Sequence, residues 1–401
     1  MYNLNIMKLT RVIHPVGQGG FYTETFVDDN GKEVFNAIYD CGSETQKPTL
    51  IKKYLKDWIN RNPQRIINAV FISHLHEDHI NGLDELLSTG RVNCLFLPQL
   101  TSKVIIEAYL YNYYKTGSLD NEGNLFISKA LRNEYQVRFV QINEMDGDNN
   151  NNPGDPIHIN EAIRNSYPSG SVFYNNFVDY HGNMFRWLYI PFNSPLQSKK
   201  GEIKNDTFFS SVKNPDGQVN PQKLMELIVT EGIEKCKSIY AEYFGKTRHN
   251  TYSMTLFSGI ENHNSIIVDY YARYTRYKCC CCDRKYCPPK RGCSPNFLYT
   301  GDFEPNRNNL RKSYVELTKE CLDRLNLWDT IRRIQVPHHG SRNNFNSTLY
   351  EYARTGYISA GSKNVHGHPN ADTLVNIQND GCVPVVVNED PKSIQKEVYL
   401  F

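Results

Sequence analysis

An apolar run that ends in a cluster of histidines and acids restricts the fold of this chain more than any other feature. Residues 70–79 read Val-Phe-Ile-Ser-His-Leu-His-Glu-Asp-His. The apolar half predicts a short buried strand, and alternate side chains of the extended segment after it project to the same side. We therefore expect His74 and His76 to face one metal ion, and Asp78 and His79 to face a second, because imidazole and carboxylate bind zinc, manganese or iron. The alternative is a polar loop whose histidines only cap the next helix, which does not explain three histidines and two acids within six positions.

Strand and helix patterns lie on both sides of this cluster. Before it, β-rich runs separated by turn residues predict a meander, and a helix follows Pro48. From residue 253 onward, predicted strands alternate with predicted helices. This mixture indicates sheets covered by helices, so we expect an α/β (α+β) fold. The predicted strands cover residues 9–16, 21–27, 34–39, 66–73, 92–97, 185–191, 253–257, 266–271, 297–299, 334–336, 357–360 and 383–387, and the predicted helices cover residues 48–59, 82–87, 104–114, 224–244, 311–325 and 371–378.

The middle of the chain does not show this regular alternation of strand and helix patterns. Residues 101–247 are rich in Tyr, Asn and Phe, and residues 143–156 form an Asn/Asp/Gly/Pro stretch that is typical of an exposed loop. We expect residues 101–247 to be a large insertion between the metal motifs of a single domain that spans residues 1–401. Such an insertion would either cap the metal cleft or dock a protein partner, and the sequence does not choose between these roles.

Charge and hydropathy exclude several classes of protein. The formal net charge is +2, so the chain lacks the overall basic field of many nucleic-acid-binding proteins, and any site for a polyanion must be local. No stretch approaches the roughly 20 apolar residues that a membrane helix needs. Residues 1–15 lack the pattern of a signal peptide. We expect a soluble, cytoplasmic protein that does not contact a membrane.

The cluster from His74 to His79, at the end of a strand, resembles the HxHxDH motif of the metallo-β-lactamase superfamily. Further motifs follow in the order of that family over residues 8–100 and 248–390. They are most similar to the metallo-β-lactamase domain of ComEC-type DNA-uptake proteins and its free-standing relatives, although Gly20 stands where this branch usually has an aspartate. These motifs are Val16-Gly17-Gln18-Gly19, Asp40-Cys41-Gly42-Ser43, Leu298-Tyr299-Thr300-Gly301-Asp302, Pro337-His338-His339-Gly340-Ser341 and Gly367-His368-Pro369.

The resemblance implies a four-layer αββα sandwich that binds two divalent metal ions, either zinc or manganese. Asp302 would bridge the two ions, and Asp40 would support a ligand from outside the metal site. Of the two adjacent histidines, we assign His338 to a metal and His339 to the substrate, although their spacing alone does not separate these roles. The implied metal ligands are His74, His76, Asp78, His79, His249, Asp302 and His338.

The further histidine ligand has two candidates in this sequence, of which His249 aligns best with the family. It stands in Arg248-His249-Asn250-Thr251-Tyr252-Ser253, ahead of a β-rich run, where the superfamily has a further histidine ligand. His263 is a rival, because it also precedes a predicted strand. A surface histidine in a turn stays the alternative for both positions.

Hydrolysis is the chemistry that a pair of such ions performs. Two cations lower the pKa of a shared water, and the hydroxide that bridges them would be the nucleophile. The resemblance implies a phosphodiesterase or nuclease with a nucleic-acid substrate, in which Asp78, His339 and His368 take part in catalysis. The implied substrate contacts are Gln18, Gly19 and Ser341.

Two other functions stay open. Thioesters, lactones and other small esters are hydrolysed on the same fold, and a fold alone does not select the substrate. The third candidate is a non-enzymatic, metal-stabilised subunit that docks a partner. The near-complete set of metal motifs argues against this third candidate.

Six of the eleven cysteines lie between residues 279 and 293. The surrounding segment, residues 276–296, separates two predicted strands, so we expect a protruding hairpin. Its thiolates match a small structural zinc site, but their spacing is not that of a standard zinc finger, so a disulfide or free thiols stay open. The basic residues around them would guide a phosphate backbone toward the metal ions, unless they are only a solvated loop. The candidate zinc ligands are Cys279, Cys282, Cys287 and Cys293.

Overall fold

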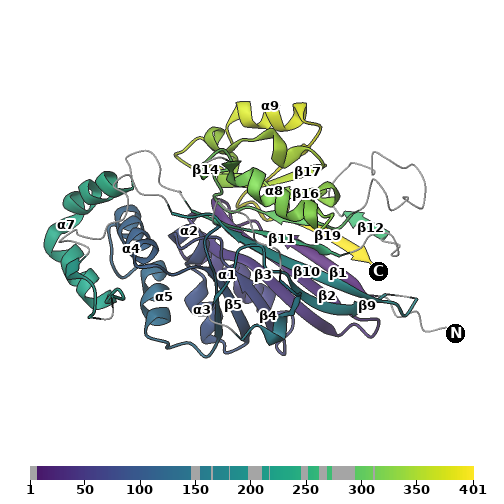
Figure 1. The fold of residues 1–401 in the computed structure, drawn as a ribbon, viewed down its shortest axis with the longest axis horizontal. Helices are drawn as coiled ribbons and strands as arrows, with labels where there is room; N and C mark the ends of the chain where they lie inside the picture. The colour runs from purple at the N-terminus through teal and green to yellow at the C-terminus, as the bar shows by residue number, and fades with distance from the viewer. Residues whose placement is uncertain are drawn as a thin grey trace.

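Two mixed β-sheets face each other and carry helices on their outer surfaces (Figure 1). This arrangement is seen in a computed structural model that describes residues 7–145, 154–163, 166–179, 181–196, 210–215, 217–244, 252–261, 269–272, 294–309 and 312–401. The predicted mixed α/β sandwich with four layers is confirmed.

The first sheet contains most strands of the N-terminal half and the last strand of the chain. Its strands are antiparallel from β12 to β3 and parallel from β3 to β8. In order across the sheet they are β12 (Asp269–Ala272), β19 (Gln395–Leu400), β1 (Lys8–Ile13), β2 (Gly19–Val27), β3 (Glu33–Ser43), β4 (Ile67–Phe71), β5 (Val92–Pro98), β6 (Arg138–Ile142) and β8 (Ser166–Tyr167).

The second sheet contains a parallel half that comes from the C-terminal part of the chain. Strands β13, β16, β17 and β18 are parallel to one another. Strand β11 is antiparallel to β13 and β10, β10 is antiparallel to β9, and the short edge strand β7 is parallel to β9. A separate short ladder joins β14 (Asn308–Asn309) and β15 (Lys312–Ser313). In order across the second sheet the strands are β18 (Val383–Val387), β17 (Thr355–Ser359), β16 (Arg333–Gln335), β13 (Phe297–Tyr299), β11 (Met254–Ile260), β10 (Met184–Asn193), β9 (Phe173–Val178) and β7 (Ile157–His158).

Three apolar cores separate the four layers. The central core lies between the sheets and is rich in aromatic rings, including Phe26, Phe71 and Tyr299. A second core joins the first sheet to helices α1 (Thr49–Asn60), α3 (Leu83–Ser88), α4 (Ser102–Thr116), α5 (Glu122–Leu131) and α7 (Pro221–Tyr243). A third core joins the second sheet to α8 (Tyr314–Arg324) and α9 (Ala371–Asn379), which lie on the opposite side of the molecule in Figure 1.

The range 101–247 differs from the insertion that the sequence predicts. Its described part supplies strands β6 to β10, which belong to the two sheets, and helices α4, α5 and α7, which pack outside them. The strand pattern is weak here because some of these strands are short and β9 carries polar residues, as in its Asn175–Asn176 pair. Most of the predicted cysteine hairpin, including all four candidate zinc ligands, lies outside the described residues.

Within the described part of the chain, no helix combines the length and the apolar character that crossing a membrane requires.

A buried charged network links the two sheets. Glu24 of β2 accepts hydrogen bonds from Arg11 Nε of β1 at 2.9 Å and from the Tyr299 hydroxyl of β13 at 2.9 Å. Arg11 also contacts Glu397 of β19 at 3.3 Å, and Glu397 accepts a hydrogen bond from Arg333 Nε of β16 at 3.0 Å. Because these strands belong to both sheets, the network fixes how one sheet lies on the other.

We predict that Glu24→Ala destabilises the fold by about 3–5 kcal/mol, because it leaves the buried Arg11 guanidinium without its closest counter-charge. Urea unfolding followed by circular dichroism would measure this loss. The matched control is Glu134→Ala, since Glu134 is 44% exposed and pairs only with Arg132; its change should stay within about 0.5 kcal/mol. Equal unfolding midpoints for the two variants would show that the network does not stabilise the sandwich.

Candidate metal centre

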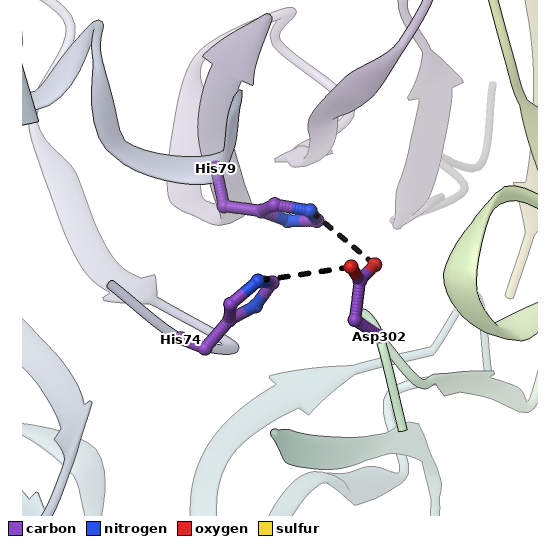
Figure 2. A group of neighbouring side chains, drawn as sticks. All are labelled: His74, His79 and Asp302. Atoms are coloured by element: carbon purple, nitrogen blue, oxygen red, sulfur yellow. Dashed lines mark ion pairs between the residues drawn. The ribbon is translucent and has the colours of Figure 1, made fainter. Parts of the chain in front are cut away.

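The predicted metal motifs meet at one edge of the sandwich. The histidine loop follows β4, Asp302 follows β13, and His338 and His339 follow β16. Strands β4, β13 and β16 belong to the parallel halves of the two sheets, and the carboxyl ends of parallel strands are where ligand sites form in such sheets. Figure 2 shows His74 and His79 pointing at the carboxylate of Asp302 from a segment more than 200 positions earlier in the chain.

The two oxygens of Asp302 face different histidines. Oδ1 lies 3.4 Å from His79 Nε2 and 3.6 Å from His339 Nε2. Oδ2 lies 3.8 Å from His74 Nε2 and 3.7 Å from His338 Nε2. A carboxylate placed in this way is able to contact two cations at once.

Asp78 adds a second carboxylate beside the two histidines that face Asp302 Oδ1. Its Oδ2 lies 3.4 Å from His339 Nε2 and 3.6 Å from His79 Nε2. The described residues thus contain two overlapping sets of potential ligands whose donor atoms lie within 4.8 Å of one another. One set is His74, His79 and Asp302, and the other is Asp78, His79 and His339.

Several ring nitrogens in this region are buried and make no hydrogen bond of normal geometry. They are His74 Nε2, His76 Nδ1, His79 Nε2 and His339 Nε2. A buried polar atom left in this state costs about 1–3 kcal/mol. Four of them at one place are explained by a group that accepts their lone pairs, so the residues present fit divalent metal ions.

Asp40 supports this centre through a β-bulge. The register of β2 and β3 shifts between Phe21 and Tyr22, and Asp40 is the extra residue, with a φ of 56°. Bulges redirect a side chain, and here the carboxylate turns toward the histidine loop. It accepts hydrogen bonds from His79 Nδ1 at 2.8 Å, from the Ser73 amide at 2.8 Å and from the Ser73 hydroxyl at 2.9 Å. This is the arrangement expected of a group that orients a metal ligand.

Two glycines, one on β2 and one on β3, allow close packing around Asp40 and the histidine loop. A Cβ on Gly42 would lie 2.5 Å from the carbonyl carbon and oxygen of Asp78 and 2.5 Å from the carbonyl carbon of His79. A Cβ on Gly20 would lie 2.8 Å from the Cβ of Asp40. A side chain at position 20 would therefore crowd Asp40.

The charges of the cluster shift the pKa values of its members. Although burial lowers it, the carboxylates of Asp78, Asp40 and Asp302 hold the pKa of His79 well above its usual range. Burial and the neighbouring His79 hold the pKa of His74 well below the usual range. Although burial raises it, the histidines around Asp302 hold the pKa of that carboxyl well below its usual range. Without a metal, compensating positive charge is therefore favoured on His79, and, although burial lowers it, the pKa of His339 is raised as well by the nearby Asp302 and Asp78.

The adjacent histidines lie in a strained turn, with φ values of 49° for His338 and 55° for His339. His339 Nδ1 donates to the carbonyl of Ser359 at 2.7 Å, which leaves the lone pair on the Nε2 that faces Asp78. His338 is 25% exposed and faces the other oxygen of Asp302 from the open side. This placement favours the reverse of the assignment made from the sequence, with His339 as the metal ligand.

His76 differs from the other motif histidines, because its Nε2 faces Glu107 of α4 and not Asp302. No sequence pattern pointed to Glu107, which is a single acid on a helix 31 positions later. His249 and its rival His263 lie outside the described residues.

The open side of the centre carries His368 and two further basic groups. The ring of His368 lies 5.5 Å from that of His338, and burial together with the nearby His338 lowers the pKa of His368 to about 4. Lys115 Nζ of α4 lies 3.3 Å from His366 Nε2, and the ring of His366 stacks near His368 at 5.9 Å. An anionic group would meet these side chains before it reached Asp302.

The main-chain N–H groups predicted to contact substrate already make hydrogen bonds within the protein. The main-chain amide of Gln18 donates to the Thr45 hydroxyl at 3.1 Å, and the main-chain amide of Ser341 donates to the carbonyl of His338 at 2.9 Å. A Cβ on Gly19 would lie 2.5 Å from the carbonyl oxygen of Asp78, so this glycine packs against the histidine loop.

We predict that Gly42→Ala weakens metal binding by at least about 10-fold, because the new methyl group must push back the main chain of Asp78 and His79. Calorimetric titration with Zn²⁺ would measure the change, and circular dichroism would verify the fold. The control is Gly90→Ala, since a Cβ at Gly90 would meet no atom of the described residues within 4 Å. Equal zinc affinities in the two variants would contradict the proposed packing.

The raised pKa of His79 predicts how metal binding depends on pH. A cation on His79 Nε2 must displace a proton, so zinc affinity should rise with pH. The rise should continue above pH 7, where an ordinary histidine with a pKa of about 6.5 has already lost its proton. Titrations in several buffers from pH 6 to pH 9 would test this, and an affinity that levels off below pH 7 would contradict it.

Comparisons with known proteins give limited similarities. A family model described as "Anti-Pycsar protein Apyc1" matches residues 19–178, which include the histidine loop and Asp40 but not Asp302 or His339. The structure of unliganded yeast PDE1 matches with a TM-score of 0.39 at 9% identity, covering 96% of this chain and 88% of that chain. A long form RNase Z from yeast matches with a TM-score of 0.31 at 9% identity, covering 88% of this chain and 36% of that chain. No curated protein matches the sequence significantly.

Proposed function

We propose that this protein is a metal-dependent hydrolase of phosphodiesters. The observation that carries the proposal is the position of Asp302, whose two oxygens face separate groups of histidines that come from distant parts of the chain. A carboxylate shared in this way is the feature that a pair of hydrolytic metal ions needs and that a single structural ion does not.

The residues divide between two metal positions. Asp78, His79 and His339 would hold one ion together with Oδ1 of Asp302. His74 Nε2 and His76 Nδ1 would hold the other together with Oδ2 of Asp302. Imidazole and carboxylate ligands suit zinc or manganese. When bound, such a pair lowers the pKa of water and polarises a phosphoryl oxygen.

The residues around the ligands have separate tasks. Asp40 holds the His79 ring through Nδ1, and Ser359 holds the His339 ring in the same way. His368, whose pKa is lowered to about 4, is neutral at pH 7 and is able to donate a hydrogen bond to a phosphate oxygen. Lys115 supplies positive charge at the open side.

Two kinds of phosphodiester are candidates for the substrate. The resemblance of the motifs to ComEC-type domains favours nucleic acid. The family model that matches residues 19–178 favours a cyclic nucleotide. Both contain the anionic phosphodiester that the positive charge of Lys115 at the open side would attract.

We predict that the purified protein, supplied with Mn²⁺ or Zn²⁺, hydrolyses single- or double-stranded DNA or RNA, or a cyclic nucleotide. Asp78→Ala should reduce the rate by at least about 100-fold, since loss of even the outer partners of metal ligands costs about 10- to 100-fold. The control is Asp57→Ala, an exposed aspartate on α1 that should leave the rate unchanged.

A panel of phosphodiester, thioester and lactone substrates separates the alternatives. Cleavage of thioesters or lactones alone would keep the hydrolase and overturn the phosphodiester assignment. Absence of hydrolysis of every substrate in the panel, by folded protein loaded with either metal, would overturn the enzymatic function and favour a partner-binding subunit.

A further inference from the structure

A buried acid lies behind one histidine of the metal motif. Glu107 of α4 is 1% exposed, and its two carboxylate oxygens lie 3.1 and 3.2 Å from His76 Nε2. The His76 ring also stacks on Tyr111 of the same helix, with ring centroids 3.7 Å apart and planes at 17°. Two residues one turn apart on α4 therefore hold the His76 ring, because Glu107 contacts its edge and Tyr111 stacks on its face.

The contact with Glu107 decides which nitrogen of His76 carries the proton. A carboxylate only accepts hydrogen bonds, so Nε2 donates and Nδ1 keeps its lone pair. This Nδ1 is buried and makes no hydrogen bond. The His76 ring lies 4.5 Å from the ring of His74, whose Nε2 faces Asp302. The lone pair of His76 is therefore available to a cation that lies beside His74.

Helix α7 completes this arrangement. The hydroxyl of Tyr240 donates to Glu107 Oε1 at 2.6 Å. Burial and the nearby Glu107 raise the pKa of the Tyr240 hydroxyl well above its usual range, so this hydroxyl stays protonated and donates. Glu107 cannot turn away from His76 without breaking hydrogen bonds in a buried environment, which would leave unsatisfied donors.

On the basis of the proposed metal-dependent function, we infer that Glu107 and Tyr240 are positioning residues that hold His76 with Nδ1 directed at the metal beside His74. A histidine ligand whose second nitrogen donates to a carboxylate has its tautomer and ring orientation set. Helices α4 and α7 are then part of the metal centre and not a separable cap. The competing explanation is that Glu107 only satisfies the buried Tyr240 hydroxyl and stabilises the packing of the helices.

The test compares Glu107→Gln and Tyr240→Phe with the wild type. Gln keeps the size of Glu but removes its charge and one of its acceptor oxygens. The matched control is Tyr109→Phe, because Tyr109 is another buried tyrosine of α4 and its hydroxyl bonds Ser128, away from His76. Zinc binding is measured by calorimetry and by metal analysis, and the coordination is followed by the visible absorption of protein loaded with Co²⁺.

In Glu107→Gln we expect one of the two zinc-binding events to weaken by about 10- to 100-fold, while the other is unchanged. The Co²⁺ absorption should change with it. Tyr240→Phe should weaken the same event by a smaller factor, and Tyr109→Phe should leave both events unchanged.

Unchanged zinc affinities and an unchanged Co²⁺ spectrum in Glu107→Gln would overturn the inference and leave the proposed function intact, even if the melting temperature fell. If Glu107→Gln does not fold, the same criteria apply to Tyr240→Phe, which retains the ring. Absence of zinc binding by the wild type would instead remove the proposed function, and this inference with it.

Discussion

Three carboxylates at the edge of the sandwich impose the constraint on which the rest of the centre depends. Asp40 and Asp302 are at most 2% exposed, and Asp78 is 15% exposed. Ionised groups are kept in such places only when they are paired and hydrogen-bonded. The surrounding imidazoles provide this pairing, with His79 in contact with all three acids. The same alternation of acids and imidazoles that makes the burial tolerable also makes a set of ligands for divalent cations.

The main chain around these acids is held in conformations that a regular strand or turn would not adopt. Asp40 occupies a bulge, and His338 and His339 both have positive φ values. Strained residues of this kind persist when the surrounding structure over-determines them, and they concentrate at functional sites. Here the ends of parallel strands in two sheets provide that support, since β4, β13 and β16 each lead directly into the centre.

The buried network of Arg11, Glu24, Glu397 and Arg333 gives the two sheets a fixed relation to each other. This matters for the metal centre because the histidine loop belongs to the first sheet, whereas Asp302 and His339 belong to the second. A slip of one sheet on the other would separate the two halves of the ligand set. The charged contacts that stabilise the fold thus also set the distances within the site.

The sequence by itself determined the features that depend on neighbours along the chain. The apolar run of β4, the polar cluster after it and the exact extents of β13 and β18 follow from local periodicity, and the order of the motifs pointed to convergence on Asp302. It did not reveal α5, β6, β9 or β19, because these elements carry weak or polar patterns. Strands β6 and β19 in addition pair with strands that are distant along the chain. Only the tertiary structure decided that His339 faces Asp78 and that His76 is held by Glu107 and, through it, by Tyr240. These choices depend on atoms that approach within about 3 Å from positions 31 to 261 residues apart, and no local pattern encodes such distances.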